Sequence, residues 1–127
     1  MASLHVILVG HCTPDAAMLR SAVSRVVPDV RFTSVNHERE LEQHRSRGVL
    51  WLVNRALDGR FESEDGVAII AQAASGSHAP TCLLVSNFPE AQAAAMEAGA
   101  LRGFGKSALY ADATVAAIRD AASACVA

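Results

Sequence analysis

The sequence has few cysteines, and their arrangement excludes two common classes of small protein. The three residues, Cys12, Cys82 and Cys125, are odd in number and match neither a zinc-binding spacing nor a CxxC pair. We therefore expect free thiols that are buried or partly buried, as is usual in a reducing compartment. Neither a disulfide framework nor a metal site is predicted to hold the fold together.

Long apolar runs and clusters of basic residues are also absent. No stretch approaches the roughly 20 apolar residues of a membrane span, and residues 1–9 lack the basic start and cleavage site of a signal peptide. The formal net charge is −2, and no dense stripe of Lys and Arg offers the clustered cations that nucleic-acid phosphates require. We expect a cytoplasmic protein that binds neither membranes nor nucleic acid.

The length of the chain sets its domain organisation. A chain of 127 residues fits one domain and buries roughly two thirds of the surface that its unfolded form exposes. No internal repeat, low-complexity tract or linker interrupts the sequence. Residues 1–127 are therefore predicted to form a single domain with a sizeable core.

Five short apolar runs have the length and composition of β-strands. They are Leu4–Val9, Val30–Val35, Val49–Asn54, Thr81–Val85 and Leu101–Phe104. The third run has five consecutive apolar residues before its terminal Asn54, which is typical of a central parallel strand buried on both faces. The second run alternates apolar and polar residues, which predicts a less buried edge strand.

Helical patterns separate these runs. Thr13 is predicted to be the N-cap of the first helix, with Pro14 at the first helical position and Asp15 facing the positive end of the dipole. The polar stretch 36–47 predicts an exposed helix stabilised by charge pairs and ended by Gly48. Further helices are predicted over 67–74, 89–98 and 112–125, the last capped by Asp112. Residues 54–65 are predicted to form a surface loop.

Short strands that alternate with longer helices give five βα units. Such alternation requires parallel pairing through right-handed crossovers. The sequence therefore predicts an α/β fold with a doubly wound, five-stranded parallel sheet, (βα)5. Because binding sites in open sheets lie just past the carboxyl ends of the strands, Asn54 is a candidate site residue.

Three polar residues at strand ends carry a resemblance to a known family. Asn54 ends the third strand, Ser86 follows the fourth, and Lys106 follows the fifth. This spacing, over the whole chain, resembles the receiver domain of two-component response regulators, with its phospho-acceptor Asp, Ser or Thr, and Lys. The resemblance implies the strand order 2-1-3-4-5 in a three-layer α/β/α arrangement, and a role in signal transduction.

The sequence departs from the receiver pattern at the acidic positions. The family has two acidic residues at the end of the first strand, where this chain has Gly10 and His11, and Asn54 replaces the acceptor Asp. Mg²⁺ prefers anionic oxygen ligands, and only a carboxylate oxygen can attack a phosphoryl donor to give an acyl phosphate. We therefore expect a degenerate pseudo-receiver that is not phosphorylated. Asp58, which precedes Gly59, is expected to serve a turn.

The remaining pocket residues allow two interpretations. Lys106, His11 and Arg55 are expected near the strand ends with no acidic group at the aligned positions, which leaves a neutral or positive pocket. In the first interpretation Lys106 is a structural relic that binds the Asn54 amide oxygen. In the second, the pocket and the first helix N-terminus accept an anion or small ligand, which makes the chain a sensor.

No enzyme activity, metal or cofactor is predicted. His11 and Cys12 are adjacent at a strand end and point to opposite faces, so they cannot easily chelate one ion. Ser86 and His11 would need an orienting acid and an oxyanion-hole loop, and the sequence offers neither near them.

The resemblance to receiver domains also implies a switch aromatic residue and a surface for contact with partners. Receivers place a switch aromatic two or three positions before the Lys, and here Phe104 lies two and Gly103 three positions before Lys106. Phe104 is the candidate switch aromatic only if the alignment slips by one residue. By resemblance, we expect contacts with a signalling protein, or a homodimer, through the region Pro89 to Cys125.

Overall fold

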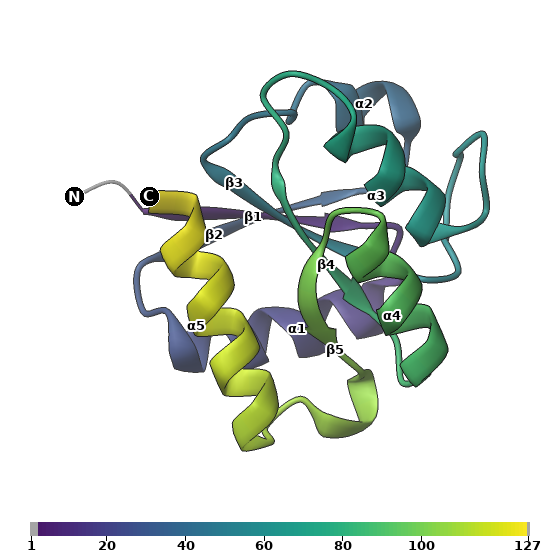
Figure 1. Ribbon diagram of the computed structural model, residues 1–127. Helices are drawn as coiled ribbons and strands as arrows, with labels where there is room; N and C mark the ends of the chain where they lie inside the picture. Colours follow the sequence, from purple (N-terminus) through teal and green to yellow (C-terminus); the bar gives the residue numbers. More distant parts are fainter. Residues whose placement is uncertain (1–2, 127) are drawn as a thin grey trace.

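The computed structural model describes residues 3–126, in which strands and helices alternate along the chain (Figure 1). The strands are β1 (Leu4–Val9), β2 (Val30–Val35), β3 (Val49–Asn54), β4 (Thr81–Val85) and β5 (Leu101–Phe104). The helices are α1 (Thr13–Val26), α2 (Glu38–Glu42), α3 (Gly66–Ala74), α4 (Pro89–Glu97) and α5 (Asp112–Val126), with a 3₁₀ turn at Lys106–Ala108. The five predicted strand ranges are confirmed.

The five strands form one parallel sheet in the order β2-β1-β3-β4-β5. This confirms the predicted fold class and strand order. β2 and β5 lie at the two edges, so the interpretation of Val30–Val35 as an edge strand is also confirmed. All strands point the same way, which brings the residues that follow β1, β3, β4 and β5 to one edge of the sheet.

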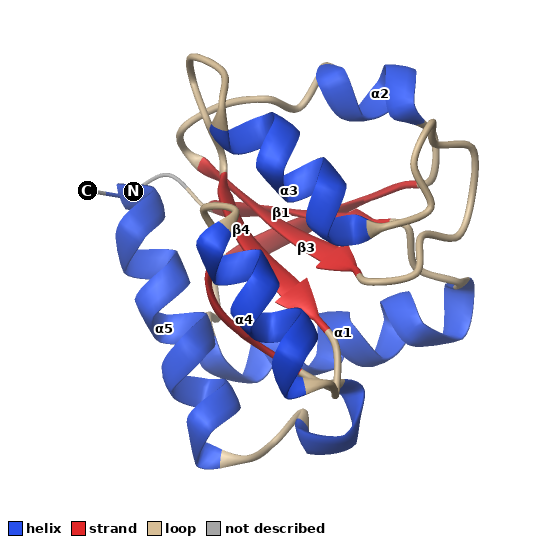
Figure 2. Ribbon diagram, turned by 45° about the vertical axis from the view of Figure 1, so that its right-hand side comes forward, coloured by secondary structure: helices blue, strands red, loops and turns tan. Residues whose placement is uncertain are grey.

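Helices cover both faces of the sheet and create two hydrophobic cores (Figure 2). One core joins the sheet to α1 and α5 and includes Leu19 and Ile118. The other joins it to α2, α3 and α4 and includes Leu41, Ile70 and Ala95. The arrangement is the predicted three-layer α/β/α sandwich.

The central strand β3 contributes to both cores. Leu50 and Leu52 belong to the α1–α5 core, whereas Trp51 and Val53 belong to the core under α2, α3 and α4. All four side chains are fully buried, as expected of a parallel strand with helices on both faces. The buried indole of Trp51 donates a hydrogen bond of 3.2 Å to the carbonyl oxygen of His44, so its one polar atom is satisfied.

The predicted helix over 36–47 is wrong in length. α2 comprises only Glu38–Glu42, and the ring of His37 caps it by accepting a hydrogen bond from the Arg39 amide. Leu41 is its one buried residue. A single apolar contact with the core provides too little packing energy to stabilise a longer helix. Gly48 therefore does not end this helix.

The first turn of α1 starts one residue earlier than the sequence pattern predicts. Cys12 is the N-cap, and its carbonyl accepts the hydrogen bond from Ala16 that closes the first turn. Thr13 and Pro14 are thus the first two helical residues, and the prediction of Thr13 as N-cap is wrong. Pro14 is still tolerated, because the amide groups of the first turn have no partner within the helix.

The cysteines are free thiols, as predicted. Cys82 is buried, and Cys12 and Cys125 are half-buried. Burial raises the pKa of the Cys82 thiol to about 12, which keeps this thiol protonated and unreactive.

Over residues 3–126, each helix is either too short or too polar to cross a lipid bilayer.

Candidate functional site

The carboxyl edge of the sheet forms a small cleft between β3, β4 and the β5–α5 connection. The cleft has a volume of about 180 Å³ and contains three of the predicted site residues, Asn54, Ser86 and Lys106. Gly10 and His11, at the end of β1, do not line it. The structure therefore brings Asn54, Ser86 and Lys106 together, but it leaves Gly10 and His11 outside this cleft.

Gly10 lies beneath the β3–α3 loop, and Leu57 of that loop occupies the space beside it. A Cβ atom added at Gly10 would lie 2.6 Å from Leu57 Cδ2, and the residue has a φ of +74° that favours glycine. The Gly10 carbonyl oxygen accepts hydrogen bonds of 2.9 Å from the Asp58 amide and from Asn54 Nδ2. A larger side chain at position 10 would have to displace this loop.

His11 is buried, with 3% of its surface exposed. Its Nε2 donates a hydrogen bond of 2.9 Å to the carbonyl oxygen of Leu52, while Nδ1 has no partner. Burial lowers the pKa of His11 to about 4, and the positive charge of Lys106 acts in the same direction. The imidazole is therefore neutral at physiological pH. Its hydrogen bond to Leu52 joins the residue after β1 to β3.

Asn36, which follows β2, fixes the loop over the end of β1. Its Nδ2 donates hydrogen bonds of 3.0 Å to the His11 carbonyl and 2.8 Å to the Asp58 carbonyl. The Asn36 carbonyl accepts a bond of 2.8 Å from the Arg60 amide. Asn36 was not predicted as a site residue, although the signal for such a bridge is present: an amide side chain directly after an edge strand.

Lys106 forms an ion pair with Asp15 of α1. The distance from Lys106 Nζ to Asp15 Oδ2 is 2.6 Å, and both side chains are partly exposed. The hydrogen bond from Lys106 holds the pKa of the Asp15 carboxyl below its usual value. The aligned positions carry no acidic group, but the Asp15 carboxylate from α1 offsets the charge of Lys106, so the pocket is less positive than expected. Lys106 Nζ donates to Asp15, and among residues 3–126 no hydrogen bond joins it to the Asn54 amide oxygen. Asn54 Nδ2 donates to the Gly10 carbonyl.

Ser86 and its neighbour Asn87 are engaged in local structure. Ser86 Oγ accepts a hydrogen bond of 3.1 Å from the Phe88 amide at the start of α4. Asn87 Oδ1 accepts bonds from the Ser107 amide (3.1 Å) and the Ser107 hydroxyl (2.9 Å). These bonds tie the β4–α4 turn to the segment after β5, beside Lys106.

The side chain of Gln92, on α4, occupies the space beside Gly103 of β5. Its Nε2 donates to the carbonyl oxygens of Leu84 (2.9 Å) and Ser86 (3.1 Å), and its Oε1 accepts from the Gly103 amide (3.2 Å). A Cβ atom at Gly103 would lie 2.1 Å from the Leu84 carbonyl oxygen and 2.9 Å from Gln92 Oε1. No side chain at position 103 can therefore share this space with Gln92.

Phe104 lies on the opposite face of the sheet from Gln92. It is 6% exposed and belongs to the core formed with α1 and α5. The candidate switch aromatic is thus a core residue in this structure, and its role as a switch stays a prediction.

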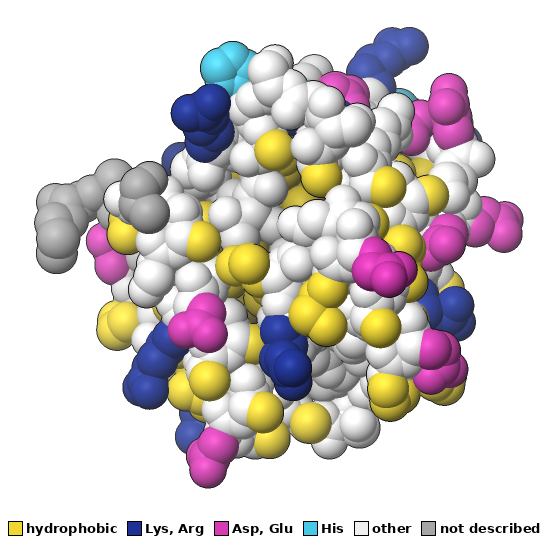
Figure 3. All heavy atoms as spheres, viewed as in Figure 1, with side chains coloured by type: hydrophobic (Ala, Val, Ile, Leu, Met, Phe, Trp, Pro, Cys, Tyr) yellow, Lys and Arg dark blue, Asp and Glu magenta, His cyan; other side chains and the backbone are white. Residues whose placement is uncertain are grey.

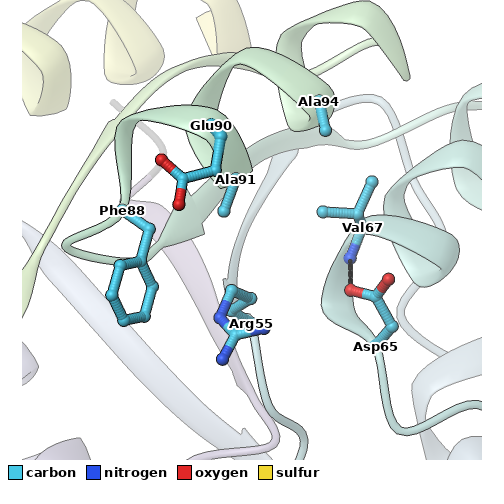
Figure 4. A pocket seen from close by; sticks show the side chains of 7 residues that line it. All are labelled: Arg55, Asp65, Val67, Phe88, Glu90, Ala91 and Ala94. Carbon is cyan, nitrogen blue, oxygen red and sulfur yellow. Dashed lines mark hydrogen bonds between the residues drawn. The ribbon is translucent and has the colours of Figure 1, made fainter.

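Arg55 directly follows β3 and contacts the ring of Phe88. Its guanidinium lies 5.2 Å from the centre of the Phe88 ring, within a second cleft between α3 and α4 (Figure 4). The expected convergence of Arg55 with His11 and Lys106 is therefore only partial, because Arg55 borders the strand-end cleft but directs its charge to Phe88.

Comparison with known proteins gives fold-level matches only. No family model matches the sequence, and no curated protein matches it. Among solved structures, a response regulator from Thermotoga maritima matches with a TM-score of 0.72 at 16% identity, over 96% of this chain and 99% of that one. This chain has the receiver fold.

Two further solved structures support the same conclusion. The signal receiver domain of a DNA-binding response regulator from Colwellia psychrerythraea 34H matches with a TM-score of 0.69 at 13% identity, over 93% of this chain and 97% of that one. A response regulator from Burkholderia pseudomallei, with a phosphorylated aspartic acid, matches with a TM-score of 0.65 at 16% identity, over 96% of this chain and 69% of that one.

The receiver fold implies a magnesium ion at the strand ends, and the residues of this chain do not fit one. Gly10 has no side-chain ligand and Leu57 fills the space beside it, while His11 is turned into the core. Asn54 presents an amide whose nitrogen binds the Gly10 carbonyl. Within residues 3–126, no three His, Cys, Asp or Glu side chains are arranged to hold a metal ion. Magnesium requires anionic oxygen ligands in octahedral geometry, and these positions supply none.

Proposed function

We propose that this chain is a signal-transduction module with a receiver fold that is not phosphorylated and that acts through protein–protein contacts. The observation that carries the proposal is the closed first-strand position, where Leu57 packs against Gly10 in place of an acidic side chain. A phosphoryl acceptor at Asn54 would need a carboxylate, since an amide is a poor nucleophile. It would also need a metal, and Gly10, His11 and Asn54 offer no carboxylate to bind one.

The hydrogen bonds around the strand ends support a single resting conformation. Lys106 is neutralised by Asp15, and Gln92 binds both β4 and β5. Asn36 secures the β3–α3 loop. Because Lys106 and Gln92 already have partners, a phosphoryl group at the strand ends would have to displace Asp15 to reach the charge of Lys106. We infer that partners recognise this one conformation.

The contact surface that we propose comprises α4, β5 and α5, from Pro89 to Cys125. Met96 and Leu101 are among the exposed large hydrophobic residues of the chain, and hydrophobic side chains lie among charged ones over this face (Figure 3). A hollow of about 290 Å³ between β5 and α5 has Arg102 and Asp120 among its lining residues. Opposite charges on one patch allow a second copy to pair with it, so a homodimer is one form of the proposed contact.

Charge reversal tests this surface. Arg102→Glu is expected to abolish self-association, or binding of a recovered signalling partner, in sedimentation and affinity-capture experiments. Arg31→Glu, on the exposed side of the β2 edge, is the matched control and is expected to have no effect. In a homodimer, combining Arg102→Glu with Asp120→Arg is expected to restore association. Binding that survives Arg102→Glu, or that requires a phosphodonor, would contradict the proposal.

An anion or small-ligand sensor at the strand-end cleft is the alternative function. The cleft holds Asn54, Ser86 and Lys106, but Asp15 already neutralises the one lysine, and Ser86 binds the Phe88 amide. An anion would have to displace Asp15 to gain the charge of Lys106. Thermal stabilisation by phosphate or sulfate at low millimolar concentration would favour this alternative over the contact module.

A further inference from the structure

The cleft between α3 and α4 lies beside the strand-end cleft, with which it shares Arg55 and Phe88. It has a volume of about 380 Å³ and opens to solvent. Its lining residues are Arg55, Asp65, Val67, Phe88, Glu90, Ala91 and Ala94 (Figure 4). The proposed contact surface on α4, β5 and α5 does not include the α3 side of this cleft.

The floor of the cleft is apolar. The α3 sequence, Gly-Val-Ala-Ile-Ile-Ala-Gln-Ala-Ala, contains no charged residue, and α4 faces the cleft with the small side chains of Ala91 and Ala94. Phe88, the N-cap residue of α4, forms one wall and remains 51% exposed. An exposed aromatic ring beside an apolar floor is typical of a site that a partner covers.

The rim of the cleft is acidic. Asp65 caps α3 by accepting a hydrogen bond of 3.0 Å from the Val67 amide, and Glu90 lies in the first turn of α4. Both carboxylates are exposed, and within residues 3–126 neither forms a salt bridge. The one cation of the rim, Arg55, is placed over the Phe88 ring. Two more exposed carboxylates, Glu62 and Glu64, precede Asp65 in the chain.

We propose that this cleft binds a peptide segment of a partner protein that presents an apolar side chain flanked by Lys or Arg. The apolar side chain would contact Phe88, Val67 and the alanines, and its burial would favour binding. The flanking cations would lie opposite Asp65 and Glu90, and this charge complementarity selects basic over acidic segments. Arg55 extends its charge over Phe88 and would repel a cation placed against that ring. The basic groups therefore belong at the two carboxylates, which lie on either side of Arg55 (Figure 4).

This inference goes beyond the proposed function, because it assigns a second surface and the chemistry of its ligand. It does not depend on the α4–β5–α5 contact. The Arg102→Glu variant tests the α4–β5–α5 contact, and the peptide titration tests the cleft. Failure of one is therefore distinguishable from failure of the other.

The experiment uses two short amphipathic peptides, one of Leu and Lys and one of Leu and Glu, titrated into the isotope-labelled full chain. The Leu–Lys peptide is expected to shift the amide resonances of Asp65–Val67 and Phe88–Ala94 and to bind more weakly as salt is added. The Leu–Glu peptide is expected to leave them unchanged. No binding of the Leu–Lys peptide, equal binding of both peptides, or shifts confined to another face would overturn the proposal.

Two variants identify the carboxylates that contribute. Asp65→Asn keeps an N-cap side chain while removing the charge, and Glu90→Gln removes the second charge. Each is expected to weaken binding of the Leu–Lys peptide about threefold, in line with exposed ion pairs, whereas Glu40→Gln on α2 is expected to have no effect. Equal losses in all three variants would contradict a local role. Concentration-dependent shifts without peptide at Asp65–Val67, on the α3 side that the proposed α4–β5–α5 contact does not include, would identify a second copy as the occupant and overturn the proposal as well.

Discussion

Lys106 Nζ lies 2.6 Å from Asp15 Oδ2, although the two residues are 91 positions apart in the sequence. Lys106 is the only lysine of the chain, and it follows β5, whereas Asp15 belongs to the first turn of α1. The pair fixes the β5–α5 connection against the start of α1. It also partly offsets the positive charge of Lys106 at the strand ends.

Breaking this pair is expected to cost little stability, because both side chains are partly exposed to water. Lys106→Met should lower the free energy of unfolding by about 1 kcal/mol in urea denaturation, and Asp15→Asn by a similar amount. The double variant should lose less than the sum of the two. Glu42→Gln, which breaks the exposed Glu42–Arg45 pair, is the control, with an expected loss of about 0.3 kcal/mol. Strict additivity of the two losses would contradict a direct interaction.

Gly10→Ala is expected to destabilise the protein strongly. The added Cβ would meet Leu57 Cδ2 at 2.6 Å in a residue with a φ of +74°, and the two effects together should cost about 3 kcal/mol. Gly48→Ala is the matched control, because nothing lies within 4 Å of its added Cβ, and it should change stability by less than about 0.5 kcal/mol. Equal effects of the two substitutions in urea denaturation would show that Leu57 does not close the site.

Gln92→Ala should lower the free energy of unfolding by about 2 kcal/mol. The substitution leaves the carbonyl of Leu84 and the amide of Gly103 without their side-chain partner in a partly buried position. Gln72→Ala, on the exposed side of α3, is the control and should change the unfolding midpoint little. Hydrogen exchange should also be faster in β5 of the Gln92 variant. Unchanged exchange there would contradict the role of Gln92 as a tie between β4 and β5.

The stability of the protein should depend on the protonation of His11. Burial lowers the pKa of His11 from 6.5 to about 4, so the unfolded chain binds a proton between these values while the folded protein does not. Stability should therefore be fully present above pH 6.5 and fall as the pH drops from 6.5 to 4, by about 3 kcal/mol.

The His11→Gln variant separates this effect from the others. The difference in unfolding free energy between pH 7 and pH 4 should shrink in the variant, whereas the contribution of His5, whose pKa burial also lowers, remains in both proteins. The Asp15 carboxyl has its pKa lowered from 3.8, so its contribution is lost only in more acidic solution. A pH profile that is the same with and without His11 would show that this ring does not titrate as described.

The strands of this protein could be predicted from the sequence because each is a local pattern. Residues 49–53 are an unbroken apolar run, which predicts burial on both faces of that strand. Val30–Val35 alternates apolar and polar residues, which predicts burial on one face. The stretch 36–47 misled because charge periodicity can suggest a helix, yet Leu41 alone anchors α2 to the core. A helix without an apolar face gains too little from packing to extend.

The contents of the site could be predicted only in part. The residues missing from the receiver pattern, at Gly10, His11 and Asn54, were visible because each is defined by its place after a strand. The groups that replace them come from other elements, and neither Leu57 nor Gln92 belongs to a recognisable motif. Gly103 was a usable signal, since a glycine where a side chain is expected indicates that another group fills the space.

The strand-end pocket is expected neither to bind magnesium together with a phosphoryl group nor to accept a phosphoryl group covalently. The direct measurement is incubation of the chain with Mg²⁺ and acetyl phosphate or beryllofluoride, followed by intact mass and amide chemical-shift mapping, with a receiver that carries an acceptor Asp as positive control. We expect an unchanged mass and unchanged resonances at Asn54, Ser86 and Lys106. A stoichiometric phosphoryl adduct, or beryllofluoride shifts centred on Asn54, would contradict the account.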